Sequence, residues 1–262
     1  MNLLQEWAEW KVESPPYILA SDLPLIMSER SAQATVIKRS WAEAITADDF
    51  CAPGDARLHL GLLPIPYIGD LRRATIFLLM LNPGLGPDDY FGEYQITGFR
   101  EALLSNLKQD FSDKSQPFLF LDPQYSWHGG FDRWHSKLAG VIGELAKIWR
   151  TTYSSARTEL GRSLACIELF PYHSRSFNDI GGWLQNLQSV QLARSYVHDV
   201  VMQRVHCKEA IVIVTRQSRV WGITESDCVV VYTCREARAA YLTPSSRGGK
   251  AIIAHLSSQS RP

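Results

Sequence analysis

The chain has 262 residues, of which 45% are hydrophobic, and its 27 basic residues balance its 27 acidic ones. This length supports a full hydrophobic core in one α/β domain, or in one domain with an added N-terminal segment. The zero net charge argues against a protein that coats nucleic acid by charge alone, and no apolar run approaches the roughly 18 to 20 residues of a membrane-spanning helix.

The cysteines exclude several kinds of site. All five are scattered and none forms a CxxC pair, so the spacing of a zinc ribbon, an iron–sulfur cluster or a disulfide framework is missing. The N-terminus carries acids where a secretion signal would carry bases before an apolar run. We therefore expect a cytoplasmic protein with reduced thiols, no metal and no membrane partner.

The N-terminal part of the chain is predicted to be helical. Its apolar residues recur at helical spacing, at Leu3, Leu4, Trp7 and Trp10. A second helix is expected over residues 31–45. We interpret residues 1–57 as a helical extension that packs on a core domain of residues 58–262.

The core domain alternates apolar strands with amphipathic helices. Residues 74–81 are predicted to form a strand buried on both faces, because polar residues never interrupt them. Further strands are expected within residues 58–69, 163–170, 209–216 and 228–233. Helices are expected over residues 98–109, 129–149 and 187–206, and the segment 248–256 closes the domain. This alternation is typical of an α/β protein with a helix-covered, mostly parallel sheet.

Ligands of such sheets bind beyond the carboxyl ends of the strands, so the residues after each strand are the informative ones. The corner Asn82-Pro83-Gly84 follows the strand 74–81 directly. Proline fixes φ, glycine allows a tight turn and a close backbone approach, and Asn82 projects an amide that can hold a water or a ligand hydroxyl. The alternative is that Asn82 only caps a turn or a helix.

A buried strand that ends in Leu-Asn-Pro-Gly-Leu, residues 81–85, with aromatic residues soon after it, resembles the first motif of the uracil-DNA glycosylase superfamily. The resemblance is to its mismatch-specific and single-strand-selective branches, although Met80 replaces the leading glycine of the motif. It implies a three-layer α/β sandwich with a central, mostly parallel sheet of four or five strands. In that family the asparagine, here Asn82, positions the water that attacks C1′ of a flipped nucleotide, and Pro83 and Gly84 shape the site.

Two more roles follow from the resemblance. An aromatic residue stacks on the extruded base, which points to Tyr94, with Tyr90 and Phe91 as alternatives. The family's second motif ends a strand with a residue, usually asparagine, that contacts the Watson–Crick edge of the base, and Glu168 holds this place. A carboxylate only accepts hydrogen bonds, so Glu168 fits an exocyclic amino group such as N4 of cytosine better than O4 of uracil. Glu168 could instead activate water or stabilise the positive sugar, or simply pair with an arginine.

The third motif of the family is a loop that holds DNA phosphates. Its match here is residues 241–249, with contact positions at Thr243, Ser245, Ser246 and Arg247. The catalytic histidine of that loop is missing, so either Arg247 or His173 is expected to stabilise charge on the departing base. Four further ring residues either line a channel for bases or pack in the core: Trp127, His128, Trp134 and His135.

The charges are unevenly distributed along the chain. Residues 1–60 hold nine acids against five bases, whereas residues 216–262 hold seven bases against three acids. This distribution favours either an anion-binding face near the C-terminus or an ordinary solvated tail.

The resemblance as a whole implies a monofunctional DNA glycosylase of base excision. It would flip a base, of cytosine type or otherwise modified, out of single- or double-stranded DNA and hydrolyse its N-glycosidic bond. No lysine lies in residues 82–95 or 166–178, which disfavours a Schiff-base lyase. The enzyme would be a monomer and need no organic cofactor. Two alternatives stay open: a nucleic-acid-binding module that lost the chemistry, and an unrelated α/β hydrolase of a small metabolite.

Overall fold

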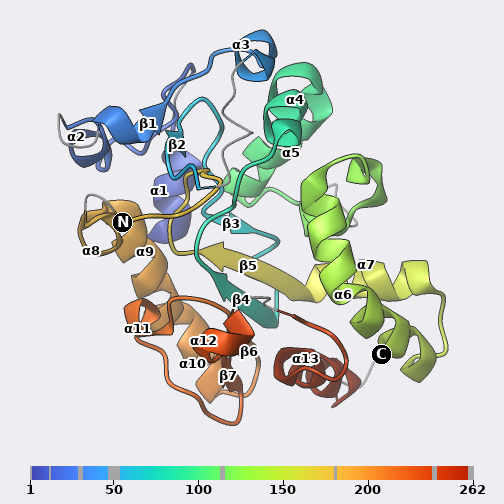
Figure 1. Cartoon of the computed structure of the whole chain (residues 1–262). Helices are drawn as coiled ribbons and strands as arrows, with labels where there is room; N and C mark the ends of the chain where they lie inside the picture. The colour runs from blue at the N-terminus through green and yellow to red at the C-terminus, as the bar shows by residue number, and fades with distance from the viewer. Residues whose placement is uncertain are drawn as a thin grey trace. The chain divides into compact units, whose positions relative to one another are not determined.

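The computed structural model describes residues 2–11, 13–28, 32–46, 54–112, 116–179, 182–237 and 241–258. Its internal contacts divide the chain into two compact units, whose elements are drawn in Figure 1. The first unit comprises Met1–Tyr67, Leu81–Asp110 and Glu168–Val197, and the second comprises Ile68–Met80, Phe111–Ile167 and His198–Pro262. The chain therefore passes between the two units several times.

A five-stranded sheet with the order β3-β5-β4-β6-β7 forms the centre of the second unit, apart from its terminal residues Tyr67 and Glu168. Its strands are β3 (Tyr67–Ile68), β4 (Ile76–Met80), β5 (Leu164–Glu168), β6 (Ile211–Val214) and β7 (Val229–Val231). The pairs β4–β6 and β6–β7 are parallel. Nearly every residue of β4, β5 and β6 is buried, as expected for strands covered on both faces. The expected α/β class with a mostly parallel sheet is confirmed.

Six helices of the second unit lie within its described residues: α6 (Gly129–Ile148), α7 (Tyr153–Ser163), α10 (Met202–His206), α11 (Ser218–Trp221), α12 (Cys234–Ala237) and α13 (Arg247–Ser258). Two 3-10 turns, Leu119–Leu121 and Pro123–Tyr125, precede α6. The helix expected over residues 129–149 is confirmed as α6, which buries one apolar stripe. The strand predictions at residues 74–81, 163–170, 209–216 and 228–233 are also confirmed.

Helices α10 and α13 cover opposite faces of the sheet. The Arg204 guanidinium of α10 lies 5.3 Å from the centre of the Phe77 ring. Phe77 is in register with Val212, so the next residue of β6, Ile213, points to the other face. On that face Ile213 approaches Gly248 of α13 so closely that a Cβ at Gly248 would lie 3.3 Å from its Cγ2. The second unit is thus layered as helix, sheet and helix.

Two glycines of α6 differ in what surrounds them. A Cβ at Gly140 would lie 2.7 Å from Cδ of Pro244, whereas a Cβ at Gly143 would meet no atom within 4 Å. We expect Gly143→Ala to raise the free energy of unfolding by about 0.5–1 kcal/mol, because alanine is the better helix former. Gly140→Ala should gain clearly less or lose stability, because the proline ring cannot move aside. Urea unfolding measures the free energy of unfolding of the two variants. An equal gain in stability at both positions would contradict the close approach of Pro244 to Gly140.

Within its described residues, the first unit contains short helices around two small parallel strands, β1 (Thr35–Val36) and β2 (Leu58–His59). Its helices are α1 (Leu3–Glu9), α2 (Leu23–Ile26), α3 (Trp41–Ile45), α4 (Pro87–Gln95), α5 (Thr97–Lys108), α8 (Trp183–Asn186) and α9 (Gln188–Tyr196). Helix α1 contacts both α5 and α9. The helices expected at the N-terminus and over residues 98–109 are confirmed as α1 and α5. The one expected over residues 187–206 is confirmed as α9, a π-helical turn (Val197–Val201) and α10.

The helix expected over residues 31–45 is wrong in its first part. Residue 31 lies outside the described residues, a 3-10 turn covers Ala32–Ala34, and Thr35–Val36 forms β1. β-branched side chains favour a strand here, and β2 supplies a partner for it. Only Trp41–Ile45 is helical, and Oγ of Ser40 caps it by accepting a hydrogen bond from the backbone N–H of Glu43 at 3.1 Å.

Buried hydrogen bonds hold the N-terminal segment in the first unit. The two carboxylate oxygens of Asp22 accept from the Tyr172 hydroxyl at 2.7 Å and from the Ser189 N–H at 3.1 Å. The same hydroxyl accepts from the Leu19 N–H at 3.1 Å. Burial raises the pKa of Asp22, and these hydrogen bonds oppose that effect. Residues of the proposed extension 1–57 therefore share one core with the segments that follow β4 and β5.

None of the helices in the described ranges has the length and apolarity that a bilayer crossing requires.

Candidate functional site

The strand order singles out the carboxyl end of β4. The chain runs from β4 to its neighbour β5 on one side and later to its neighbour β6 on the other side, so the direction of winding reverses at β4. Ligands of open α/β sheets bind beyond the carboxyl ends of the strands at such a reversal. Residue Leu81 and the corner Asn82-Pro83-Gly84 follow β4 directly.

The segments that follow β4 and β5 are hydrogen-bonded to each other within the first unit. The backbone N–H of Phe170 donates to the carbonyl of Leu81 at 2.9 Å. Nδ2 of Asn82 donates to the carbonyl of Ser174 at 3.3 Å and lies 3.0 Å from its Oγ. Two of the motif segments singled out in the sequence are thus adjacent in the structure.

These bonds define the orientation of the Asn82 amide. Only the nitrogen of an amide can donate to a carbonyl, so Nδ2 must face Ser174 and Oδ1 must face away from it. In the part of the chain that the structure describes, no group donates to Oδ1. Asn82 is only partly buried. Its Oδ1 can therefore accept a hydrogen bond from a water or from a ligand.

A hydrogen bond from His173 stabilises the corner. Its Nδ1 lies 2.9 Å from the carbonyl oxygen of Gly84. A carbonyl only accepts, so Nδ1 carries the proton in this contact. Gly84 has a φ of +82°, which favours glycine, and both Pro83 and Gly84 are partly exposed. His173 itself is 2% exposed, which places it behind the corner.

Glu168 is the last residue of β5 and belongs to the same unit as Asn82. Its backbone N–H donates to the carbonyl of Pro66 at 2.9 Å. The residue is 6% exposed, and its Oε2 atom is shielded from solvent. A ligand could contact this carboxylate only after the residues that cover it move.

Tyr90 is a core residue. It is completely buried, and its hydroxyl lies 3.1 Å from Nδ1 of His59. Tyr90 forms a hydrophobic cluster with Ala44 and Leu62. A ring in this position has no free face for a base.

Tyr94 and Phe91 remain more accessible. Tyr94 lies parallel to Tyr90, and its hydroxyl donates to the carbonyl of Gly61 at 2.7 Å. Burial raises the pKa of Tyr94, so the hydroxyl stays a protonated donor. Phe91 is 37% exposed and contacts Trp41 edge to face at 5.5 Å. Of the three aromatic residues named from the sequence, Phe91 presents the most open ring.

Sequence reasoning missed helix α4 and, with it, the buried carboxyl of Glu93. The backbone N–H of Leu63 donates to both carboxylate oxygens of Glu93 at 3.1 and 3.0 Å, and Arg100 lies 3.3 Å away. Burial raises the pKa of Glu93 well above its ordinary value, whereas the bond from Leu63 and the charge of Arg100 lower it. The signal was present, because Glu93 falls on the same helical stripe as Tyr90 and Tyr94.

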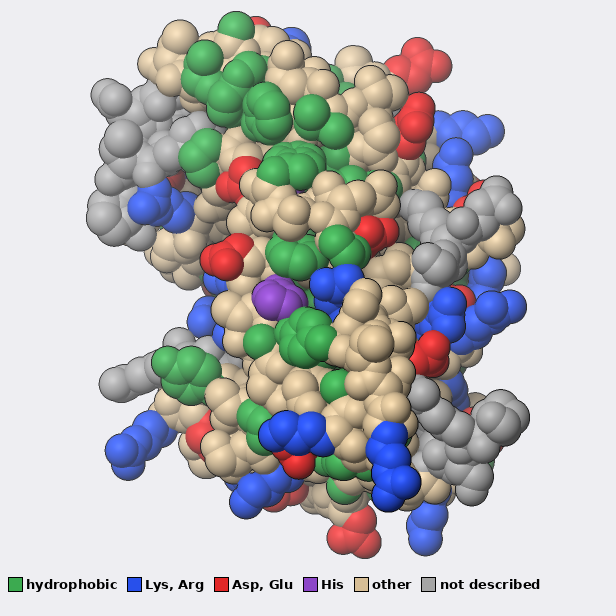
Figure 2. Space-filling view, turned by 90° about the vertical axis from the view of Figure 1, so that its right-hand side faces the viewer, with side chains coloured by type: hydrophobic (Ala, Val, Ile, Leu, Met, Phe, Trp, Pro, Cys, Tyr) green, Lys and Arg blue, Asp and Glu red, His purple; other side chains and the backbone are tan. Residues whose placement is uncertain are grey.

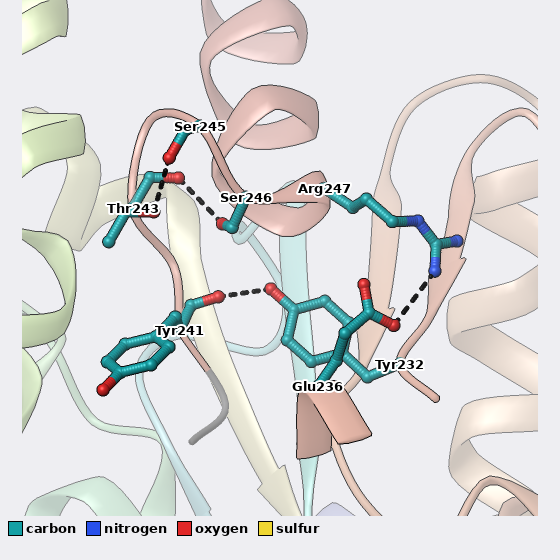
Figure 3. A pocket seen from close by; sticks show the side chains of 7 residues that line it. All are labelled: Tyr232, Glu236, Tyr241, Thr243, Ser245, Ser246 and Arg247. Atoms are coloured by element: carbon teal, nitrogen blue, oxygen red, sulfur yellow. Dashed lines mark hydrogen bonds and ion pairs between the residues drawn. The ribbon is translucent and has the colours of Figure 1, made fainter. Parts of the chain in front are cut away.

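The loop that was matched to phosphate contacts lies in the second unit, where it lines a pocket of 270 Å³ (Figure 3). Oγ of Ser246 accepts from the N–H of Gly249 at 3.1 Å and donates to the carbonyl of Thr243 at 2.8 Å. The hydroxyls of Thr243 and Ser245 lie 3.2 Å apart. The loop thus caps the start of α13. The full lining is Tyr232, Glu236, Tyr241, Thr243, Ser245, Ser246 and Arg247.

Two carboxylates form ion pairs with Arg247. Its guanidinium forms ion pairs with Glu225 and, at 3.3 Å, with Glu236. Figure 3 shows the pair with Glu236 on one side of the pocket and Tyr241 on the other. A DNA phosphate at Arg247 would have to displace at least one of these carboxylates. The loop belongs to the second unit and the corner to the first.

The four ring residues proposed as a base channel fall into two groups. Trp134 and His128 are buried, and Nδ1 of His128 caps α6 by accepting from the Gly130 N–H at 2.9 Å. Trp127 is exposed, and His135 is partly exposed and stacks on Phe131 at 5.2 Å. On the face drawn in Figure 2, basic side chains are interspersed with acidic and hydrophobic ones. Among the described residues, no three His, Cys, Asp or Glu side chains group as metal ligands.

Comparison of the chain with protein-family models, with curated proteins and with solved structures gave no significant match. The likeness to uracil-DNA glycosylases therefore rests on the sequence motifs alone. A function follows from them only as a proposal.

Proposed function

We propose that the chain is a monofunctional DNA glycosylase whose reaction centre is the corner after β4. The observation that supports this most is the orientation of Asn82. Two contacts with Ser174 hold its Nδ2, so Oδ1 points away as an acceptor at the point where α/β sheets bind ligands. An acceptor in a rigid corner can hold a water in line with a sugar carbon.

In the proposed reaction, water replaces the base on C1′ of a flipped nucleotide. The bond between C1′ and the base nitrogen breaks, and the base takes both electrons. The water held by Asn82 Oδ1 forms the new bond to C1′ and loses a proton to the solvent, and the departing base anion takes up a proton from the solvent. The products are the free base and an abasic site.

The base would be held between an aromatic ring and the end of β5. Phe91 and Tyr94 are the candidates for stacking, because Tyr90 is fully buried. Glu168 would accept a hydrogen bond from an exocyclic amino group, which favours cytosine-type or otherwise modified bases over uracil. No organic cofactor takes part in this scheme.

A panel of oligonucleotides tests the proposal. Single- and double-stranded substrates with uracil, hypoxanthine or modified cytosines are incubated with the protein, and abasic sites are revealed by alkaline cleavage. We expect cleavage at an amino-bearing base, and Glu168→Gln should lower that rate about 10-fold, because a charged acceptor at the base edge is replaced by a neutral, weaker one. If the protein released only uracil, and if Glu168→Gln left the rate of release unchanged, the preference for an amino-bearing base would be contradicted. If none of the substrates gave abasic sites, the proposed glycosylase activity would be contradicted.

The burial of Glu168 favours a second candidate, a nucleic-acid-binding module on the same fold that has lost the chemistry. A carboxylate that is 6% exposed reaches a base only if the residues that cover it move. This module would bind DNA with an affinity that falls with salt and would make no abasic sites. Filter binding beside the cleavage assay separates the two functions.

A further inference from the structure

The pocket before α13, drawn in Figure 3, takes no part in the reaction proposed at the corner. Its volume of 270 Å³ is just below the range of about 300–1,000 Å³ that is typical of ligand pockets, so a ligand here must be small. Its side chains are a carboxylate, two tyrosine rings, three hydroxyls and one guanidinium, that of Arg247. Arg247 is the only cation among the described lining residues. Whether the pocket accepts an anion therefore depends on the partners of Arg247.

The charge of Arg247 is more than balanced by its partners. One terminal nitrogen pairs with Glu225, and the other lies 3.3 Å from Oε2 of Glu236. The hydrogen bond from Arg247 lowers the pKa of Glu225. The pKa of Glu236 is lowered chiefly by the backbone N–H of Thr233, so both carboxylates are ionised at neutral pH. The guanidinium and its two carboxylates carry one net negative charge, which favours a cation over an anion.

One oxygen of Glu236 remains available to a ligand. Its Oε2 atom accepts from the backbone N–H and the hydroxyl of Thr233, both at 2.8 Å, in addition to Arg247. Its Oε1 atom has no donor in the part of the chain that the structure describes. Because Glu236 is partly exposed and lines the pocket, a ligand N–H can donate to this ionised acceptor.

Tyr241 offers a ring with no partner of its own. It is 62% exposed, and neither a second ring nor a cation of the described residues contacts it. Its backbone carbonyl accepts from the Tyr232 hydroxyl, which fixes the residue at the pocket. In Figure 3 Tyr241 lies across the pocket from Glu236. The face of such a ring attracts a cation electrostatically.

We propose that the pocket before α13 binds a small organic ammonium ion, which donates to Oε1 of Glu236 and lies against the ring of Tyr241. The hydroxyls of Thr243 and Ser245, 3.2 Å apart, add neutral acceptors for the remaining N–H groups. This inference goes beyond the proposed function, because it concerns a pocket of the second unit and requires no DNA.

Three probes of equal length test the charge of the ligand. Isothermal titration calorimetry measures the affinity of the full chain for n-butylammonium, n-butanol and butyrate, which differ in their head groups. We expect butylammonium to bind about 10-fold more tightly than butanol, because its hydrogen bond to the carboxylate is charged at both ends, and butyrate to bind more weakly than either. Equal binding of butanol, tighter binding of butyrate, or no binding of butylammonium would overturn the proposal.

Two glutamine variants separate the pocket acceptor from the charge around Arg247. Glu236→Gln removes the ionised acceptor and should weaken butylammonium binding about 10-fold. Glu225→Gln is the matched control, because it removes the same charge from the same guanidinium at a position that does not line the pocket. This control should weaken binding less than about 3-fold, as expected for an exposed charge. Equal losses in both variants would mean that net charge alone attracts the ammonium, which would overturn the site.

Two variants of Tyr241 test the ring, and they decide the proposal even if Glu236→Gln fails to fold. Tyr241→Ala should weaken butylammonium binding about 3-fold, whereas Tyr241→Phe should keep the affinity, since phenylalanine retains the aromatic face. Circular dichroism melting checks that each variant folds. An unchanged affinity of Tyr241→Ala would contradict the contact with the ring. The abasic-site assay stays independent: failure of ammonium binding contradicts this pocket only, and absence of abasic sites contradicts only the proposed enzyme.

Discussion

Asn82→Ala is expected to lower the rate of abasic-site formation by about 100-fold or more. The substitution removes the acceptor that holds the attacking water, and a nucleophile displaced by about 1 Å already costs about this factor. The fold should survive, because Asn82 is partly exposed and its side chain is bonded only to Ser174 among the described residues. Single-turnover kinetics on the best oligonucleotide substrate measures the effect.

Ser174→Ala is the matched control. It removes the hydroxyl near Nδ2 of Asn82 but keeps the carbonyl that accepts from Nδ2 at 3.3 Å. The amide should then stay in place on one hydrogen bond, and the rate should fall much less than in Asn82→Ala. An Asn82→Ala protein that forms abasic sites at the original rate would contradict the role of Asn82 in the mechanism.

Asp22→Ala is expected to lower the free energy of unfolding by about 2–4 kcal/mol. It leaves two buried donors, the Tyr172 hydroxyl and the Ser189 N–H, without their acceptor, and each costs about 1–3 kcal/mol. The side chain of Asp22 is fully buried, so water cannot replace it readily. Urea unfolding followed by tryptophan fluorescence gives the change in free energy.

Asp22→Asn separates the hydrogen bonds from the charge. Asparagine keeps one acceptor oxygen and adds no charge to the core, so this variant should lose less than Asp22→Ala. Surface substitutions usually change the free energy of unfolding by less than about 0.5 kcal/mol. If Asp22→Ala changed the free energy of unfolding by no more than this, the hydrogen bonds of Asp22 would not be what holds the N-terminal segment.

The strands were predictable because their signal is local. Ile76–Met80 and Ile211–Val214 are unbroken apolar runs with neighbouring turns, and only a strand covered on both faces buries such a run. Residues 31–45 carry no such signal. A short parallel partner at Leu58–His59 decided between strand and helix there, and a partner distant in sequence leaves no local trace.

The position of Asn82 at the end of a buried strand, in a corner that requires glycine at position 84, was determined by the sequence alone, because it depends on a few consecutive residues. Only the tertiary structure decided that Asn82 turns its amide nitrogen toward Ser174, that Tyr90 is buried and that Arg247 is neutralised by Glu225 and Glu236. Each of these depends on partners that folding brings together from separate segments. Hydrogen bonds and ion pairs form with whichever group packing places within reach, and that choice involves the whole core.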